Sequence, residues 1–426
     1  MKLKSLGAIA AASTFLLAGC ASGGTAESPE ETETAAPLVE EQETNDPVTI
    51  TLASWGSSPS ETASLEEAIQ GFKAAYPYID VELIVHADHG KDMAAKFAAG
   101  NPPDVFYLDA GIAQEWISQG VLYGLSSSIE ASDFNIEGFN ESFVRPFTGA
   151  DGQVYGLPKD ANPLVLEGNS ELMAQAGISS LPTTVAEFDA QAELLLAEGI
   201  VPMCVDADIN RLGAFFISFG GGLATDDWSS SKLTSAGTEA AMTWAMDNYK
   251  KGVFQMPSQL SAGWAGEAFG LGKCAYTMEG AWLDPYLRDS FPEVYEVMVK
   301  SELPVKDTAG SLAFTAAYAI GKDSTNKEAA WKFVSFMTGP EGMEIWTSKG
   351  VAIPSRTDVA TPSGYEVNGD AIANSFTKTP PFISGWGDVV GAFNNRARQI
   401  VLEGYDDPFA AAKEVLAGAE SAWPGN

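Results

Sequence analysis

From residue 48 onward the chain alternates between two hydrophobic periods, and this alternation constrains its fold more than any other feature. Residues 48–52 and 80–85 have the period of a strand, and 104–108 is a short apolar run. Between them, residues 64–76 and 91–99 repeat apolar side chains at helical spacing. Strands that alternate with helices are typical of βαβ units around a mostly parallel sheet, so the predicted fold class is α/β.

The same alternation resumes after Pro163 and continues toward the end of the chain. It predicts helices at 188–198, 238–251, 327–337 and 408–422, and strands at 200–205, 274–278 and 317–320. A chain of 426 residues has room for two or three domains.

The charge of the chain excludes one class of function. It carries 57 acidic residues against 24 Lys and Arg, a formal net charge of −33. Such a surface repels phosphate backbones, so we expect no nucleic-acid partner. Because 45% of the residues are hydrophobic, the chain can still bury a large core. Its 10 Trp residues are many for this length and need an explanation.

The first residues have the pattern of an export signal. Lys2 and Lys4 precede an apolar run, 6–18, which is shorter than the ~20 residues that span a bilayer. The run ends in LAGC, at 17–20, which resembles the bacterial lipobox, after which the Cys is acylated. We therefore expect 1–20 to be a lipoprotein signal and lipobox, with the acyl chains (palmitate among them) on Cys20 as the membrane anchor. The alternative is an ordinary cleaved signal with a chance Cys.

Residues 21–47 are expected to be a tether between this anchor and a folded body. They contain eight acidic residues and no basic one, among Ser, Thr, Gly, Ala and Pro. Such a segment repels itself and cannot bury a core, so it is predicted to be disordered. The body would then stand on the outer face of the cytoplasmic membrane, on its extracellular or periplasmic side. No later apolar run is long enough to be a transmembrane helix.

A series of short motifs resembles one protein family. The opening strand ends in ASW (53–55), and the motifs that follow, in order, are FAAGNPPDVFYLD (97–109), DGQVYGLPKD (151–160), LPTT (181–184), GGG (220–222), MEGAW (278–282), LPV (303–305), YAI (318–320) and NKEAAWKF (326–333). In this order, the motifs are similar to those of the family 1 extracellular solute-binding proteins of ABC importers, which include carbohydrate-binding relatives of maltose-binding protein.

This resemblance implies two α/β lobes that close on a ligand in the cleft between them. The first lobe would comprise 48–157 plus 315–354, and the second 158–314 plus 355–426. The hinge crossings would lie near 156–159, 312–315 and 352–356. The implied partners are a carbohydrate and the permease subunits of the importer. We expect a monomer, held to the membrane by its lipid alone, with no cofactor and no catalytic residue.

Aromatic and acidic residues stand where predicted strands end, which is where open α/β sheets bind ligands. Trp55 follows the first strand, Tyr107 and Asp109 end the third, and Glu279 and Trp282 follow the strand that begins at 274. Aromatic faces cover the C–H faces of a sugar, while carboxylates and cations bond its hydroxyls. The further candidates are Lys159, Asp160, Trp228, Trp264 and Trp386.

For each of these candidates a structural interpretation stands beside the ligand-binding one. The Trp residues could be core residues, Asp109 could cap a helix, and Lys159 with Asp160 could form a surface ion pair. Arg211 stands where relatives often place an aromatic residue, so its role is open. Trp244, Trp331 and Trp346 lie at apolar helical positions and are expected in the core.

The remaining Cys and His residues suggest little chemistry. Cys204 and Cys274 both fall in predicted strands of the second lobe, and outside the membrane such a pair favours a disulfide over two buried thiols. His86 and His89 form His-x-x-His beside Asp88, but no third His exists, so no metal site is expected.

The sequence thus predicts a lipoprotein that binds a neutral mono- or oligosaccharide for import. Two alternatives remain: a receptor for another solute such as a polyamine, which would suit the acidic balance, and a secreted glycoside hydrolase. A hydrolase needs two carboxyl groups at a set separation, and no such pair stands out. No Gly-x-Ser-x-Gly motif of a serine hydrolase occurs either.

Overall fold

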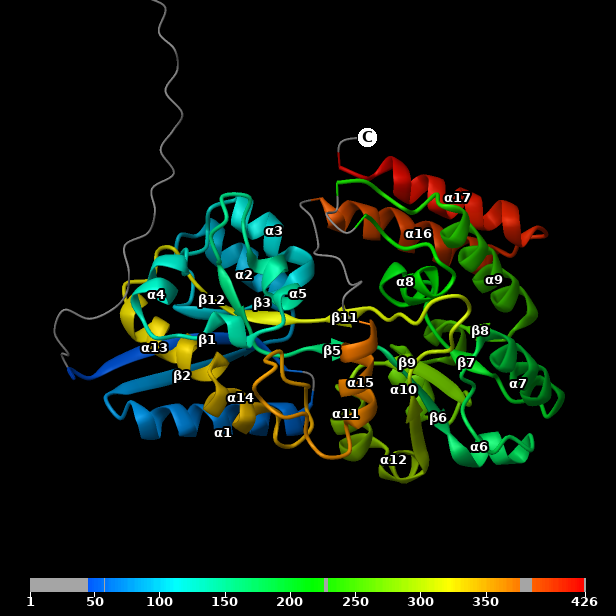
Figure 1. Ribbon diagram of the computed structural model, residues 1–426, viewed down its shortest axis with the longest axis horizontal. Coiled ribbons are helices and arrows are strands. Elements are labelled where there is room, and N and C mark those ends of the chain that lie inside the picture. Colours follow the sequence, from blue (N-terminus) through cyan, green and yellow to red (C-terminus); the bar gives the residue numbers. More distant parts are fainter. Residues whose placement is uncertain (1–44, 57, 226–228, 376–384, 425–426) are drawn as a thin grey trace, which may run out of the picture. The chain divides into compact units, whose positions relative to one another are not determined.

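The computed structural model describes residues 45–56, 58–225, 229–375 and 385–424, all of which belong to the unit that runs from Thr34 to Asn426. The predicted signal, Cys20 and most of the predicted tether lie outside the described residues. In the part of the chain that is described, no helix is long and apolar enough to cross a membrane. The elements of the described residues form two five-stranded sheets and a two-stranded ribbon (Figure 1).

The first sheet has the strand order β2-β1-β3-β12-β4. Its strands are β1 (Val48–Trp55), β2 (Ile79–His86), β3 (Val105–Asp109), β4 (Gly156–Pro158) and β12 (Ala316–Ile320). The helices of the same part of the chain are α1 (Pro59–Ala75), α2 (His89–Ala98), α3 (Ala110–Ser118), α4 (Ser126–Ala131), α5 (Glu141–Val144), α13 (Lys327–Thr338) and α14 (Pro340–Thr347), with short 3₁₀ turns η1 (Ile136–Gly138) and η2 (Arg145–Phe147).

Alternation along the strands explains why helices cover both faces of this sheet. In β3, Val105 and Tyr107 join one apolar core, whereas Phe106 and Leu108 join another. Successive side chains of a strand point to opposite faces, so a strand that is apolar throughout must be buried on both. The core around Val105 also contains residues of α1, α13 and α14.

Helix α1 begins five residues before its predicted start. The hydroxyl of Ser58 accepts a hydrogen bond from the amide of Glu61 at 3.1 Å, and Pro59 occupies the first turn. Both residues favour the beginning of a helix. The helix places its first turn directly after Trp55, at the carboxyl end of β1, and then buries Leu65, Ala68, Ile69 and Phe72 among other residues.

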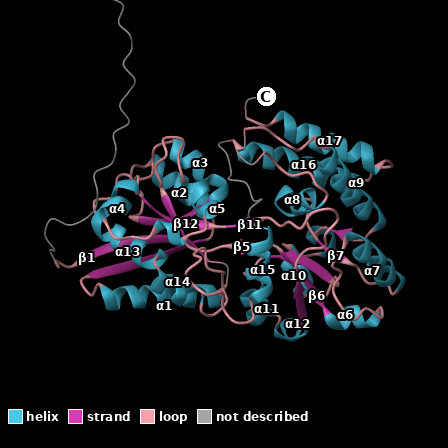
Figure 2. Cartoon of the chain, viewed as in Figure 1, coloured by secondary structure: helices cyan, strands magenta, loops and turns pink. Residues whose placement is uncertain are grey.

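The second sheet has the strand order β10-β6-β9-β7-β8. Its strands are β6 (Val165–Asn169), β7 (Met203–Cys204), β8 (Phe254–Gln255), β9 (Tyr276–Glu279) and β10 (Met298–Ser301). The helices of this part are α6 (Ser170–Gln175), α7 (Val185–Ala197), α8 (Ile209–Ser218), α9 (Ala236–Lys251), α10 (Ala265–Gly270), α11 (Leu283–Ser290), α12 (Pro292–Val297), α15 (Glu366–Ser375), α16 (Trp386–Glu403) and α17 (Pro408–Ser421), with the 3₁₀ turn η3 (Pro257–Leu260). Figure 2 shows these strands among the helices.

The largest apolar core unites this second sheet with the end of the chain. It contains Phe216 of α8 and Met246 of α9 together with Phe393 of α16 and Val415 of α17. The ring centroids of Phe216 and Phe393 are 6.0 Å apart. Because α16 and α17 share this core, the last 40 described residues belong with the second sheet and not with the first.

Three segments of the chain connect the two sheets. Strand β5 (Asn162–Pro163) pairs with β11 (Ala313–Phe314), and Ala161 forms an isolated bridge with Ile353. In Figure 1, β5 and β11 are drawn between the two sheets. The lobe boundaries given above remain a prediction, but the three crossings fall close to the predicted hinges.

Both sheets are mixed, but in each of them four of the five described strands run in the same direction, which agrees with the expected mostly parallel sheet; the reversed strands are β12 in the first sheet and β6 in the second. In the first sheet, β1 runs parallel to β2 and β3, but β12 runs antiparallel to β3 and β4. The second sheet is mixed in the same way. The reversed direction of β12 has a physical reason. The chain returns from the second sheet and enters the first at the edge where β3 ends, so Ala316, the first residue of β12, pairs with Asp109, the last residue of β3.

Candidate functional site

A cavity of about 300 Å³, which we call the central cavity, lies between the sheets at the three crossings. Its lining comes from segments distant in the sequence: Trp55, Glu61, Asp109, Lys159, Asp160, Asn162, Arg211, Trp282, Phe314, Thr315, Ala316 and Val351. The segments attached to the first sheet, the crossings and the segments attached to the second sheet all contribute. A ligand in this cavity would therefore touch both parts of the fold.

Five of the predicted site residues line the central cavity, namely Trp55, Asp109, Lys159, Asp160 and Trp282. Two more lie directly behind its wall. Tyr107 is 1% exposed and contacts Trp55, and Glu279 is 1% exposed and accepts a hydrogen bond from Trp282. The cavity therefore gathers most of the predicted residues.

Trp386, Trp264 and Trp228 have other positions. Trp386 is buried and lines a neighbouring side pocket of about 270 Å³. Trp264 is not among the residues that line these two pockets; its ring lies 4.8 Å from that of Tyr286, in the core beside α10 and α11. Trp228 lies outside the described residues.

The side pocket shares part of its wall with the central cavity. It is lined by Asp109, Ala110, Gly111, Asn210, Phe314, Thr315, Trp386, Gly387 and Val390. Asp109, Phe314 and Thr315 border both spaces. The two spaces are thus neighbours on either side of the β11 crossing.

Trp55 is held edge-on by two rings beneath it. The centroid of its ring lies 4.8 Å from that of Tyr107 and 5.3 Å from that of His89, with interplanar angles of 73° and 79°. Edge-to-face contacts of this kind are favourable and fix the orientation of a ring. The side chain remains partly exposed in the cavity, so part of its surface is available to a ligand.

Trp282 is oriented by the ion pair between Arg211 and Glu279. Its indole N–H donates to Oε2 of Glu279 at 3.0 Å. The same carboxylate binds Arg211 at two points, with Nη2 2.7 Å from Oε2 and Nε 3.4 Å from Oε1. Burial opposes the charge of Arg211, but Glu279 and, more weakly, Asp208 raise the pKa of the guanidinium.

Lys159 and Asp160 form a buried ion pair, where the sequence suggested a surface pair as the alternative to ligand binding. Their side chains are 3% and 7% exposed. The ammonium of Lys159 also lies 4.7 Å from the ring centroid of Tyr107 and 4.5 Å from that of Trp346. Cation–π contacts of this kind are strongest when they are desolvated. The cation is therefore held at the floor of the cavity by three neighbours.

Asp109 is both a helix cap and a lining residue of the two pockets. One carboxylate oxygen caps α3 by accepting the amide of Gly111 at 2.7 Å, and the residue lines both pockets. Water reaches the side chain, but protein atoms crowd around it. This loss of hydration raises the pKa of Asp109, the Gly111 amide opposes the rise, and Asp160 adds to it.

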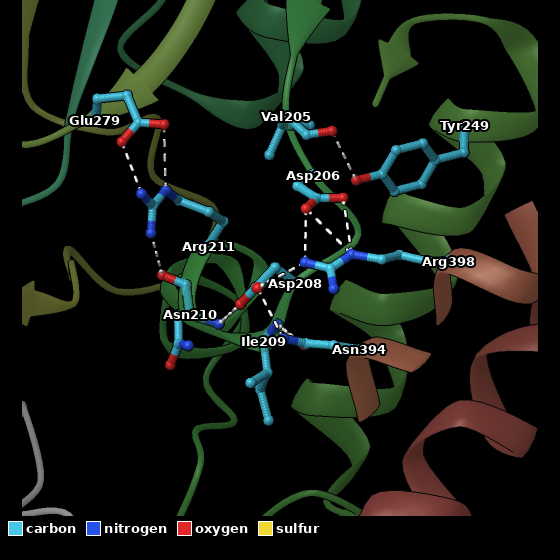
Figure 3. A network of polar contacts seen from close by, with 10 residues as sticks. All are labelled: Val205, Asp206, Asp208, Ile209, Asn210, Arg211, Tyr249, Glu279, Asn394 and Arg398. Atoms are coloured by element: carbon cyan, nitrogen blue, oxygen red, sulfur yellow. Dashed lines mark hydrogen bonds and ion pairs between the residues drawn. The ribbon is translucent and has the colours of Figure 1, made fainter. Parts of the chain in front are cut away.

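A polar network extends from Arg211 to α16, beside the largest apolar core (Figure 3). Asp208 caps α8 by accepting the amide of Asn210 at 2.7 Å. Asn394 of α16 donates to Asp208 at 2.7 Å and accepts the amide of Ile209 at 2.9 Å. Arg398, one turn further along α16, binds Asp208 at 3.0 Å and Asp206 at 2.6 Å.

Several lining residues were missed by the sequence analysis. Asn162, Phe314 and Thr315 lie in or beside the predicted hinge crossings, so the crossings themselves were the available signal. Glu61 lies in the first turn of α1, after Trp55, at a strand end that was already marked. Arg211, whose role was left open, lines the cavity.

The remaining cysteines and histidines have structural partners. The structure joins Cys204 and Cys274 in a disulfide, with their Cα atoms 5.7 Å apart and both residues buried. His86 bonds Asp92 at 2.8 Å, and His89 bonds the carbonyl of Tyr107 at 2.8 Å. Within the described ranges, no group of three or more His, Cys, Asp or Glu residues is arranged to hold a metal ion.

Comparisons with known proteins agree with this architecture. The family described as bacterial extracellular solute-binding protein matches residues 55–344, and the chain belongs to this family. A binding protein of Brucella abortus (strain 2308) is 24% identical over 375 residues, covering 84% of this chain and 89% of that protein.

Two solved structures show the same fold. An ABC substrate-binding protein of Listeria monocytogenes, solved with cycloalternan, has a TM-score of 0.76 and 23% identity, covering 88% of this chain and 99% of that one. The GacH receptor of Streptomyces glaucescens, solved unliganded and with acarbose, has a TM-score of 0.77 and 19% identity, covering 89% and 99%. The predicted two-lobed fold of the solute-binding proteins is therefore confirmed.

Proposed function

We propose that this chain is the substrate-binding lipoprotein of an ABC importer and captures a neutral mono- or oligosaccharide in the central cavity. The observation that carries the proposal is the joint presence of Trp55 and Trp282 with Asp109 and Asp160 around one space. The indole rings offer apolar faces for a sugar ring, and the carboxylates accept hydrogen bonds from its hydroxyls. The cycloalternan and acarbose bound by the two structural relatives support this class of ligand.

Capture would proceed by closure of the two lobes. A ligand that touches both lobes makes all its contacts only in the closed state, so binding shifts the population toward that state. A link between α1 and α11 supports such a closure: the amide and hydroxyl of Ser60 both donate to Asp289, at 3.1 and 2.6 Å. The closed form would then dock on the permease.

In this proposal the protein works outside the cell as a monomer, anchored through Cys20 and spaced from the membrane by residues 21–47. The anchor has a direct test in the native host. We expect the full chain to fractionate with membranes and a Cys20→Ala variant to be released or retained as uncleaved precursor. Equal membrane recovery of a mature, unacylated form of both proteins would contradict the lipid anchor.

The ligand class is tested by a thermal-shift screen of mono- and oligosaccharides. A ligand at 100 times its Kd stabilises the folded state by about 2.7 kcal/mol. We expect a shift with at least one neutral saccharide and none with spermidine. A shift with spermidine alone would replace the sugar with a polyamine, and release of reducing sugar by the purified protein would favour the hydrolase.

The location of the site is tested by Trp substitutions. Trp282→Ala and Trp55→Ala should each weaken binding of the saccharide found in the screen by about tenfold, which corresponds to about 1.4 kcal/mol, because loss of an aromatic side chain at the centre of a binding site typically costs about this much or more. Trp264→Ala is the matched control, since this Trp is partly buried against the core beside α10 and α11 and lines neither pocket. Titration calorimetry below the unfolding temperature measures all three. Equal losses at Trp264 and Trp282 would contradict the assignment.

A further inference from the structure

Helix α16 holds the first turn of α8, which supplies residues to both pockets. Asn210 lines the side pocket and Arg211 lines the central cavity. The two residues directly before them, Asp208 and Ile209, are both bonded to Asn394 of α16. The backbone from which these two lining residues project is therefore fixed from outside α8.

Arg398 of α16 binds the segment that leads into α8 at a second place. Its guanidinium binds Asp206 through Nε and Nη2, at 3.1 and 2.6 Å, and reaches Asp208 at 3.0 Å. A planar guanidinium that engages a carboxylate at two points fixes both distance and orientation. Tyr249 of α9 adds a bond from its hydroxyl to the carbonyl of Val205 at 3.2 Å. The whole segment 205–208 is thus tied to neighbouring helices (Figure 3).

Both Glu279 and Asp208 stabilise the charge of Arg211, and Glu279 is bonded to its guanidinium. Asp208 is near enough to Arg211 to stabilise its charge, yet Arg211 makes its ion pair with Glu279. Asn394 and Arg398 occupy one oxygen of Asp208, and the amide of Asn210 occupies the other. With three hydrogen bonds on its two oxygens, Asp208 has no free pair of oxygens for a two-point bond like that between Glu279 and Arg211.

We propose that Asn394 and Arg398 are positioning residues for the ligand site, which act by keeping Arg211 paired with Glu279 rather than with Asp208. The inference rests on the proposed binding function, because it assigns these residues a part in shaping the wall of the central cavity. The proposal thereby gives a part in ligand binding to Asn394 and Arg398 of α16, which do not line either pocket.

The first experiment needs no ligand. Trp282 reports on the pair because its indole N–H is bonded to Glu279. In NMR spectra of the full protein, Arg398→Met should shift the signals of the Trp282 indole N–H and the Arg211 Nε–H. Arg396→Met is the matched control, since Arg396 lies on the same helix as Arg398 but pairs with the exposed Glu414 of α17. Unchanged Trp282 and Arg211 signals in Arg398→Met would overturn the proposal, even if no saccharide were ever found to bind.

The second experiment is a double-mutant cycle with the saccharide identified by the screen. Arg398→Met should weaken its binding roughly fivefold to tenfold in the wild-type background and have almost no effect in an Arg211→Met background, because interacting residues are not additive. Arg398→Lys should restore part of the affinity, as an ammonium keeps the charge but not the two-point geometry. An equal loss in both backgrounds would show that Arg398 only stabilises the lobe, and would overturn the proposal.

Discussion

Arg211 and Glu279 face each other beside the central cavity and bond at two points, with Nη2 2.7 Å from Oε2 and Nε 3.4 Å from Oε1. The two residues lie in α8 and β9 and are 68 positions apart in the sequence. Their pair also holds the indole of Trp282. One ion pair therefore connects the second sheet, α8 and a wall of the cavity.

Removal of the Glu279 charge should destabilise the protein. Glu279→Gln keeps the shape but leaves Arg211 with no full counter-charge in a largely buried site, which costs about 3 kcal/mol. Urea unfolding measures this loss. Glu414→Gln is the control, because its pair with Arg396 is exposed and should be worth less than about 1 kcal/mol. Equal effects of the two substitutions would contradict the role assigned to the buried pair.

The side pocket gives a prediction about ligand length. Gly387 lines this pocket, and a Cβ added there would meet no atom within 4 Å. Gly387→Leu should therefore fill the pocket without disturbing the fold. We expect it to weaken only saccharides long enough to reach from the central cavity into the side pocket.

Gly391→Leu is the matched control, since it lies one turn along α16, also with open space around its Cβ, and does not line either pocket. Titrations with mono-, di- and trisaccharides compare the two variants. If Gly387→Leu weakened a monosaccharide as strongly as a trisaccharide, the side pocket would not be an extension of the site.

The buried carboxyl of Glu167 should make stability depend on pH. Burial raises its pKa well above the ordinary value, Lys300 opposes the rise, and Glu279 and Asp284 add to it. One oxygen accepts the amide of Glu279 at 2.9 Å, while the other has no hydrogen-bond partner among the described residues. The folded state therefore holds a proton that the unfolded chain releases above its ordinary pKa of 4.5.

As pH rises from 4.5 toward the raised pKa, this group should remove up to about 1.4 kcal/mol of stability per pH unit. The Glu167→Gln variant should lack this slope. Urea unfolding of both proteins between about pH 5 and 8 measures the difference. Parallel curves for the two proteins would contradict the raised pKa.

The disulfide should contribute strongly to stability. Cys204 and Cys274 close a loop with a sequence separation of 70 residues. In the chain-entropy account, a cross-link of this length stabilises the folded state by about 4 kcal/mol. We expect the Cys204→Ala, Cys274→Ala double variant to unfold at lower urea concentration, and reductant to shift only the wild-type protein. Identical unfolding of the wild type with and without reductant would argue for two free thiols.

The sequence predicted the strands and helices well where the hydrophobic period was unambiguous. Strand β2 and helix α13 have nearly their predicted bounds. The strand predicted at 200–205 is regular only over Met203–Cys204. The β-propensity of a segment shows that its backbone can adopt an extended conformation. The length of the strand that forms also depends on how far the neighbouring strands run alongside it.

The candidate site was predictable in part for the same reason. Trp55, Asp109 and Trp282 stand at or just beyond strand ends, where local pattern and ligand position coincide. Trp264 stands in a loop with Gly and Ser, and such local composition does not reveal that its ring packs against Tyr286. Asn162 lines the cavity because two crossings pair there, and such a contact between distant segments leaves no periodic signal.

The place of β12 in the first sheet has a consequence for how the protein comes to be folded. This strand lies between β3 and β4, yet it begins at Ala316, after all the strands of the second sheet. Synthesis begins at the N-terminus, so β1, β2 and β3 can pair early. Strand β4 has no strand of its sheet to pair with until β12, which ends at Ile320, has been made. We therefore expect the first sheet, although it begins first, to be completed after the strands of the second are all available, with slow closure of its long-range contacts.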